Sequence, residues 1–127
     1  MNHSVTSYDP SNIFAKILRK EIDTTPLFED EFALAFKDIN PLAPVHVLVI
    51  PKGPYRSPIA FMAQASDKEI TGFWRAVKKV VTLLKLDEKG VRFIMNDGQD
   101  GGQEVPHFHV HLLAGRPIGP MVSPSKS

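Results

Sequence analysis

The sequence contains no cysteine among its 127 residues. This absence excludes a disulfide framework, a thiol nucleophile and a thiolate metal site, and it is typical of proteins from a reducing compartment. The first twelve residues, MNHSVTSYDPSN, include no apolar run, so we expect neither a signal peptide nor a membrane span. We therefore interpret the protein as cytoplasmic.

The sequence also lacks an excess of charge, because 15 basic residues balance 14 acidic ones and the formal net charge is +1. Binding to nucleic acid or to an anionic membrane usually depends on a surplus of Lys and Arg. We therefore expect no nucleic-acid partner and no membrane partner. A smaller ligand is the better hypothesis.

The hydrophobic share of 43% is enough for one core in a chain of this length, so one domain is predicted. Residues 1–10 are polar and predict a flexible N-terminal arm, while residues 121–127 predict a C-terminal tail. The domain itself is expected to span residues 11–120.

Hydrophobic periodicity predicts an α+β fold: an antiparallel sheet of about five strands, with one short and one long helix on one face. The expected elements are a short helix over 12–22, a hairpin over 26–39, a doubly buried strand over 45–50, a long helix from Ser66 to Leu84, and strands over 91–96 and 105–114. In the hairpin, Phe32, Leu34 and Phe36 are expected to share one face. The long helix begins with a capping-box pattern at Ser66 and Glu69.

The stretch PHFHVHLL places His107, His109 and His111 at alternate positions, directly after the glycine loop DGQDGG. On a strand, alternate side chains point to one face. A further histidine, His46, interrupts the apolar strand VHVLVI. Three interpretations are open for this group: ordinary hydrogen-bonded histidines, a metal site, or a nucleophile with neighbours that bind charge.

The metal interpretation is limited by strand geometry. At about 3.3 Å per residue, His107 and His111 start about 13 Å apart, whereas zinc holds each nitrogen at about 2.1 Å. At most a neighbouring pair with His46 could share an ion, and we expect no metal. A nucleophilic imidazole whose neighbours bind a phosphoryl group agrees better with the preceding glycine loop.

These residues resemble the histidine triad (HIT) family, whose signature His-φ-His-φ-His-φ-φ, with φ apolar, is matched at every position by HFHVHLL. The stretches IFAKILRKEI, AFKDINPLAPVHVLVIPK, MNDGQDGGQEV and LLAGRPIGP are similar to the Hint-type purine nucleoside phosphoramidases, more than to the dinucleoside polyphosphate hydrolases. The resemblance covers most of residues 12–120.

The resemblance implies roles for single residues. His109 corresponds to the nucleophile that attacks the α-phosphorus, His111 to the residue that contacts a phosphate oxygen, and His107 with His46 to the supporting histidines. The implied nucleotide-binding residues are Asp38 for the ribose hydroxyls, Phe14, Ile17, Phe36 and Ile39 for the purine, Asn96 and Gly102 near the phosphate, and Glu104 and Val105 at the leaving group.

Two positions depart from the family pattern. Glu104 stands where many Hint-type proteins have Ser after GGQ, and the chain reads LAGR where they often read LGGR. A Ser hydroxyl can donate a hydrogen bond to the departing amine, whereas Glu can donate only when protonated. The backbone N–H groups of Glu104 and Val105 are therefore the expected leaving-group contacts.

The resemblance implies that the protein hydrolyses purine nucleoside 5′-phosphoramidates, of adenosine type, through a covalent nucleotidyl-histidine and without a cofactor. It also implies a homodimer, for which Trp74 on the long helix is a candidate contact. Two alternatives stay open: hydrolysis of dinucleoside polyphosphates, and a nucleotide-binding scaffold with little turnover.

Overall fold

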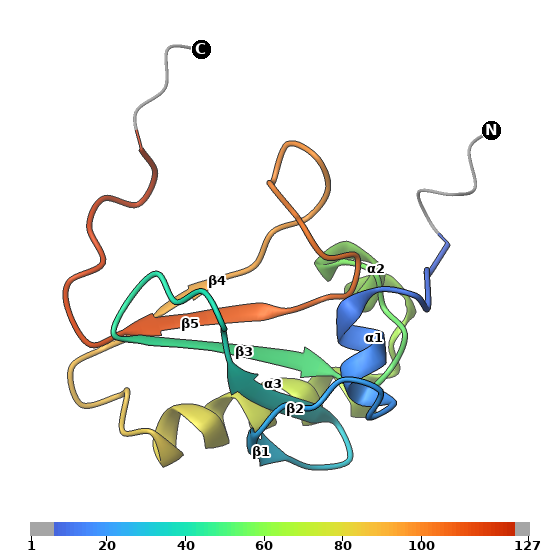
Figure 1. Cartoon of the computed structure of the whole chain (residues 1–127), viewed down its shortest axis with the longest axis horizontal. Coiled ribbons are helices and arrows are strands. Elements are labelled where there is room, and N and C mark those ends of the chain that lie inside the picture. Colours follow the sequence, from blue (N-terminus) through green and yellow to red (C-terminus); the bar gives the residue numbers. More distant parts are fainter. Residues whose placement is uncertain (1–6, 124–127) are drawn as a thin grey trace.

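The computed structural model describes residues 7–123. Its elements in chain order are α1 (Ile13–Leu18), β1 (Pro26–Glu29), β2 (Ala33–Lys37), β3 (Val45–Pro51), α2 (Pro58–Gln64), α3 (Asp67–Leu83), β4 (Arg92–Ile94) and β5 (Val110–Ala114). The five strands form one antiparallel sheet in the order β1-β2-β3-β5-β4 (Figure 1). The predicted α+β fold with a five-stranded antiparallel sheet is confirmed.

The central strands β2 and β3 are buried on both faces of the sheet. Val47 and Val49 of β3 belong to a large core with α2 and α3, whereas Leu48 and Ile50 pack with Phe14 of α1. Because side chains alternate along a strand, α1 must cover the face opposite to α3. The expectation that the helices share one face is therefore wrong for α1.

Helix α2 is absent from the sequence-based prediction, although the sequence carries its start signal. The Ser57 side chain accepts a hydrogen bond from the Ala60 N–H at 3.1 Å, and Pro58 occupies the first helical turn. Phe61 then places its ring in the core, where it is 1% exposed. The segment between β3 and α3 therefore contributes to the core through α2.

Helix α3 begins with the predicted capping box, in which Ser66 and Glu69 each accept a hydrogen bond from the other's backbone N–H. Phe73 and Val77 belong to the core, but Trp74 remains partly exposed. The predicted apolar stripe thus divides between the core and the surface.

The histidine strand is shorter than predicted, because β5 starts at Val110 and residues 105–107 form a bend. The alternation nevertheless continues through this segment. Phe108, Val110 and Leu112 all lie in the core with α3. His109 and His111, which lie between them, are therefore directed to the other face of the sheet, as the sequence predicted. His107 precedes the strand, and its ring, like that of His109, contacts Phe14 of α1.

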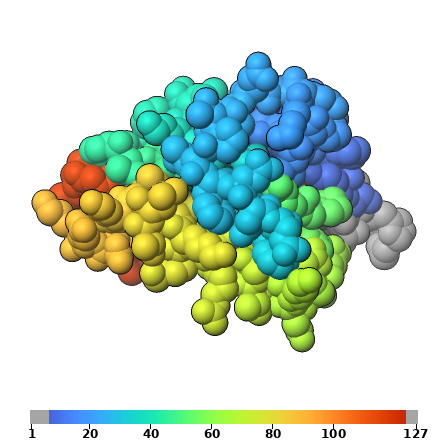
Figure 2. All heavy atoms as spheres, turned by 90° about the horizontal axis from the view of Figure 1, so that it is seen from below, coloured from blue at the N-terminus to red at the C-terminus, as the bar shows by residue number. Residues whose placement is uncertain are grey.

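Two views locate the ends of the molecule. α1 and the segment before it lie at one end, and β4 with the C-terminal segment lies at the other (Figures 1 and 2). Within residues 7–123, no helix has both the length and the apolar composition needed to span a bilayer. The predicted arm at 1–10 and tail at 121–127 extend beyond the described residues, and the predicted domain limits stay a prediction.

Phe32 does not share a face with Leu34 and Phe36, so this part of the hairpin prediction is wrong. The Asp30 carboxylate accepts hydrogen bonds from the backbone N–H groups of Phe32 and Ala33, at 2.8 Å and 2.9 Å, and this turn precedes β2. Strand alternation therefore does not extend to Phe32. Its ring instead lies against the helical Gly72, where an added Cβ would come within 2.4 Å of ring atoms.

We expect Gly72→Ala to destabilise the protein, although alanine in a helix is worth up to about 1 kcal/mol over glycine. The new methyl overlaps the Phe32 ring, and overpacking of this kind costs about 1–3 kcal/mol. In a Phe32→Ala background the same substitution should raise stability instead. Urea denaturation of the four proteins checks the sign reversal, and stabilisation by Gly72→Ala in the wild-type background would contradict it.

Candidate active site

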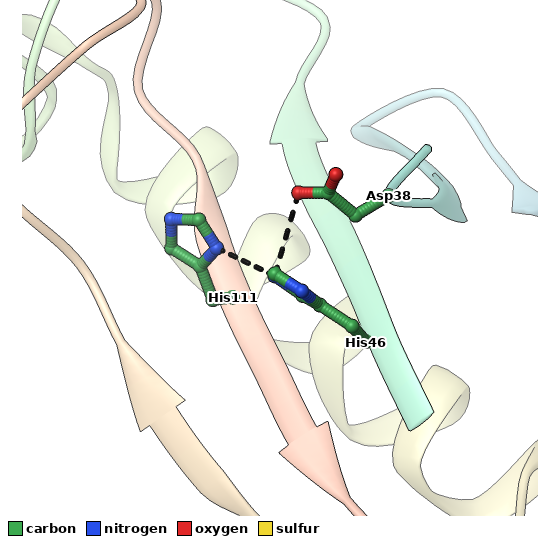
Figure 3. A group of neighbouring side chains, drawn as sticks. All are labelled: Asp38, His46 and His111. Carbon is green, nitrogen blue, oxygen red and sulfur yellow. Dashed lines mark hydrogen bonds and ion pairs between the residues drawn. The ribbon is translucent and has the colours of Figure 1, made fainter. Parts of the chain in front are cut away.

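Strands β3 and β5 bring His46 and His111 together. In the ladder between them, His46 pairs with Leu113 and Leu48 pairs with His111, so the two histidines are diagonal neighbours on one face. His46 Nε2 and His111 Nδ1 are 2.9 Å apart (Figure 3). The strand register alone therefore explains why a histidine inside VHVLVI reaches the histidine triad.

The partners of His46 determine which nitrogens carry protons in this pair. The Leu42 backbone N–H donates to His46 Nδ1 at 3.1 Å, so this nitrogen carries no proton in the neutral ring. His46 then carries its proton on Nε2 and donates it to His111 Nδ1. It follows that neutral His111 holds its own proton on Nε2, as a donor for a further acceptor.

Asp38 lies beside this pair, after the end of β2. Its Oδ2 is 3.4 Å from His46 Nε2 (Figure 3), and its Oδ1 accepts from the Asn40 N–H at 2.8 Å. The Asp38 N–H also donates to the His46 carbonyl at 3.0 Å. Asp38 thus stabilises its own turn and also adds a carboxylate to the group of histidines.

Asp38, His46 and His111 also have the composition of a metal site, since one potential ligand atom of each lies within 4.8 Å of the others. Tetrahedral zinc with two nitrogens at about 2.1 Å separates these nitrogens by about 3.4 Å. The nitrogens of His46 and His111 are 2.9 Å apart and share a hydrogen bond. An ion could bind here only after breaking that bond, and the absence of a metal stays a prediction.

His109 is buried, with 6% of its surface exposed, and its partner sets its tautomer. Its Nδ1 lies 2.7 Å from the backbone carbonyl of His107, which can only accept. Nδ1 therefore carries the proton, and the lone pair stays on Nε2. Phe14 of α1 meets this ring edge to face, with centroids 5.0 Å apart, and fixes its orientation further.

His107 is fully buried, and its hydrogen-bond partners differ from those of His109. Its Nε2 donates to the Pro51 carbonyl at the end of β3, at 3.0 Å. Its Nδ1 lies 2.7 Å from the hydroxyl of Tyr8. Both nitrogens of His107 are thus used within the protein, which agrees with a supporting role rather than a reactive one.

Burial keeps these imidazoles neutral. It lowers the pKa of His107 from the usual 6.5 to about 4, against an opposing effect of the hydrogen bond to Pro51. Burial and the nearby His109 and His46 lower the pKa of His111 to about 4 as well. The pKa of His109 is also lowered, chiefly by burial, while its bond to His107 and the charges of Asp38 and Glu104 raise it.

The glycine loop between β4 and the histidines is held by Gln103, which the sequence reasoning missed. Its Oε1 accepts from the Gly98 N–H at 3.0 Å, and its Nε2 donates to the carbonyls of Arg56 and Val105 at 2.6 Å and 3.0 Å. A Cβ on Gly101 would lie 2.3 Å from the Asp97 carbonyl oxygen. The loop therefore has a defined shape that requires glycine there.

The implied nucleotide-binding residues differ in exposure. Phe14, Ile17 and Phe36 are buried in the small core on the histidine face, whereas Ile39 is 87% exposed. The remaining members surround the glycine loop: Asn96 and Val105 are half-buried, and Gly102 and Glu104 are exposed. Gly102 adopts a positive φ of 77°.

A hollow of about 950 Å³ lies elsewhere, between β4, the end of β5 and the following segment. Phe93, Arg116 and Ile118 are among its lining residues, and none of the four histidines is. Its volume alone would make this hollow the candidate site. The histidines with defined tautomers and lowered pKa values, however, lie on the sheet face of His109. The chemistry therefore locates the candidate site at the histidines.

Comparisons with known proteins identify the family of this chain. The HIT domain profile matches residues 19–118. An uncharacterised HIT-like protein from Azospirillum brasilense is 51% identical over 117 residues, covering 92% of this chain and 96% of that one. The purine nucleoside phosphoramidase of Escherichia coli K12 is 41% identical over 112 residues, covering 87% and 92%. A histidine triad protein structure from Clostridium difficile is 39% identical, with a TM-score of 0.79 and coverage of 91% and 100%.

The chain therefore belongs to the HIT family, in its Hint-type branch, and is a nucleotide hydrolase of that family. The resemblance inferred from HFHVHLL is confirmed at this level. The roles of the individual residues stay predictions, which the geometry above now makes specific.

We expect the free energy of unfolding to decrease as the pH falls from 6.5 toward 4. In this range imidazoles of the unfolded chain bind protons, while His107 and His111, with a pKa of about 4, stay neutral in the fold. The lowering of the His107 pKa from 6.5 to about 4 corresponds to roughly 3 kcal/mol in the free energy of unfolding. Urea denaturation at a series of pH values measures this.

His107→Gln is the matched variant, because an amide can still donate to the Pro51 carbonyl but does not titrate. Its stability should depend less steeply on pH between 6.5 and 4 than that of the wild type. Equal slopes for the two proteins would show that His107 is not held neutral by burial.

Proposed function

We propose that the protein hydrolyses purine nucleoside 5′-phosphoramidates to the nucleoside monophosphate and an amine, through a nucleotidyl group on His109. The observation that carries the proposal is the tautomer of His109, which keeps a lone pair on Nε2 because Nδ1–H donates to the His107 carbonyl. A neutral imidazole with a fixed lone pair is an activated nucleophile. The phosphoramidase from Escherichia coli, at 41% identity, supports the same reaction class.

In the first step, His109 Nε2 attacks the α-phosphorus as the bond from phosphorus to the amine nitrogen breaks. The departing amine nitrogen takes up one proton from solvent. Water then attacks the phosphorus as the bond from phosphorus to His109 Nε2 breaks, its proton returns to solvent, and the monophosphate and neutral His109 are released. No redox change occurs, so positioning and charge stabilisation are the main tasks of the protein.

His111 supplies a donor for the phosphate. Since its Nδ1 accepts from His46, its proton on Nε2 is available to a nonbridging phosphate oxygen. The N–H groups of Gly98 and Gly102 are already bonded within the glycine loop, so we assign the further donors to other N–H groups of this loop. Neutral donors are suited to this task because they stabilise developing charge without requiring a buried cation.

Specificity is assigned to the remaining implied residues. We place the ribose hydroxyls on the Asp38 carboxylate and the purine against Phe14, Ile17, Phe36 and Ile39. The exposed Glu104 leaves room for varied amines, and the backbone N–H groups of Glu104 and Val105 are the proposed leaving-group donors.

The test is a single-turnover reaction of wild-type and His109→Ala protein with an adenosine phosphoramidate, followed by intact mass of the quenched protein. We expect a mass gain of one nucleotidyl group in the wild type alone, and turnover lower by about a thousandfold or more in the variant. Product without an adduct at His109 would contradict the mechanism.

A parallel reaction with a diadenosine polyphosphate, at the same concentration, distinguishes the substrate class. Faster cleavage of the polyphosphate would show that dinucleoside polyphosphates are the substrate class. The role of His109 as nucleophile would be unaffected. Binding of the monophosphate without turnover of either compound would instead favour a nucleotide-binding scaffold.

We also propose that the active form is a homodimer joined through β4 and α3. β4 is an edge strand of the sheet, and edge strands are sites of pairing with another chain. Phe93 on β4 is 52% exposed, and Trp74 and Leu83 on α3 are also exposed. Exposed large apolar side chains on these two elements support them as the interface.

Light scattering should give a mass about twice the 14.1 kDa of one chain. Phe93→Glu should shift the mass toward a single chain, because it places a charge in the proposed interface. The exposed Met121 lies in the C-terminal segment, and Met121→Glu is the control. A mass near that of one chain for the wild type would remove the proposal.

A further inference from the structure

Tyr8 makes a direct hydrogen bond to the histidine triad. Its hydroxyl lies 2.7 Å from Nδ1 of His107, and the two rings meet edge to face with centroids 5.6 Å apart. Because the Pro51 carbonyl can only accept, His107 Nε2 must hold the proton of the neutral ring. The Tyr8 O–H is therefore the donor to His107 Nδ1.

The segment that carries Tyr8 is held in place by its own hydrogen bonds. The Asp9 carboxylate accepts from the Ser11 N–H and hydroxyl at 2.9 Å and 2.6 Å. The Asn12 side chain donates to the Asp9 carbonyl at 2.7 Å and also caps α1 by accepting from the Ala15 N–H. These hydrogen bonds thus fix the backbone between Tyr8 and the start of α1.

A chain of hydrogen bonds leads from Tyr8 to the nucleophile. The Tyr8 hydroxyl and the Pro51 carbonyl hold the two sides of the His107 ring, and the backbone carbonyl of His107 accepts from His109 Nδ1–H at 2.7 Å. Phe14 of α1 contacts both histidine rings, with centroids 6.3 Å and 5.0 Å away. Any displacement of His107 therefore changes the carbonyl that fixes the tautomer of His109.

We propose that Tyr8 is a positioning residue for nucleotidyl transfer, acting on His109 through His107. The proposal rests on the proposed function. Tyr8 lies outside residues 19–118, which match the HIT domain profile. Burial raises the pKa of its phenol above the usual 10.0, which keeps the hydroxyl protonated as a donor at neutral pH.

The chain has two tyrosines, and the second provides a matched control. The Tyr55 hydroxyl donates to the Glu69 carboxylate, also at 2.7 Å, and both tyrosine hydroxyls bond within partly buried surroundings. Tyr8→Phe and Tyr55→Phe therefore each remove one hydroxyl and one short hydrogen bond. Only the first of these bonds reaches a histidine.

We expect Tyr8→Phe to lower kcat about tenfold, because the buried Nδ1 of His107 loses its donor. KM should stay within about twofold, since the substrate contacts are unchanged. Tyr55→Phe should leave kcat within about twofold, and thermal denaturation of both variants measures their stability. Unchanged kcat in Tyr8→Phe, or a loss of kcat that follows stability in both variants, would overturn the proposal.

Nitrogen NMR of the histidine rings supplies a readout that needs no substrate. In Tyr8→Phe, the Nδ1 resonance of His107 should move toward that of an unbonded ring nitrogen, and His109 should lose its single tautomer. Tyr55→Phe should change neither. If the wild type cleaves no phosphoramidate, the proposed function fails, and unchanged His107 or His109 resonances in Tyr8→Phe would overturn the Tyr8 proposal independently.

Discussion

The hydrogen bond from His109 Nδ1–H to the His107 carbonyl is the contact on which the proposed chemistry depends. It is 2.7 Å long, buried, and made to a group that cannot donate. A histidine free to exchange tautomers would hold its lone pair on Nε2 for only part of the time. Each neighbouring contact, from Tyr8 and Pro51 to His107, from Leu42 to His46, or from His46 to His111, removes the same freedom from another ring.

The core beneath the site provides the rigidity that these hydrogen bonds need. Phe108, Val110 and Leu112 alternate with the three histidines and pack in the core that α3 covers. Side chains in such a core occupy well-defined positions, so the histidines between them inherit a fixed backbone. The same burial that stabilises the fold lowers the histidine pKa values, so packing and catalysis have one physical origin.

Strand alternation was enough to predict the face of His107, His109 and His111, and the capping box predicted the start of α3. The same alternation could not say that α1 covers the opposite face, because a doubly buried strand presents apolar residues to both layers. Phe32 was misplaced because the turn at Asp30 interrupts the period before β2. The roles of Tyr8 and Gln103 depend on hydrogen bonds to residues 99 and 47 positions away, and residue spacing holds no information on such contacts.

The charges around His109 favour the intermediate over the free enzyme in the proposed mechanism. Attack through Nε2 while Nδ1 keeps its proton turns the ring into a nucleotidyl imidazolium, which carries a positive charge. Asp38 and Glu104 are the charged groups that act on His109, and both are acidic. Their field and the His107 carbonyl stabilise the charged adduct more than the neutral ring, which is the difference that accelerates a reaction. Burial keeps the ring neutral before attack, so the same surroundings serve both states.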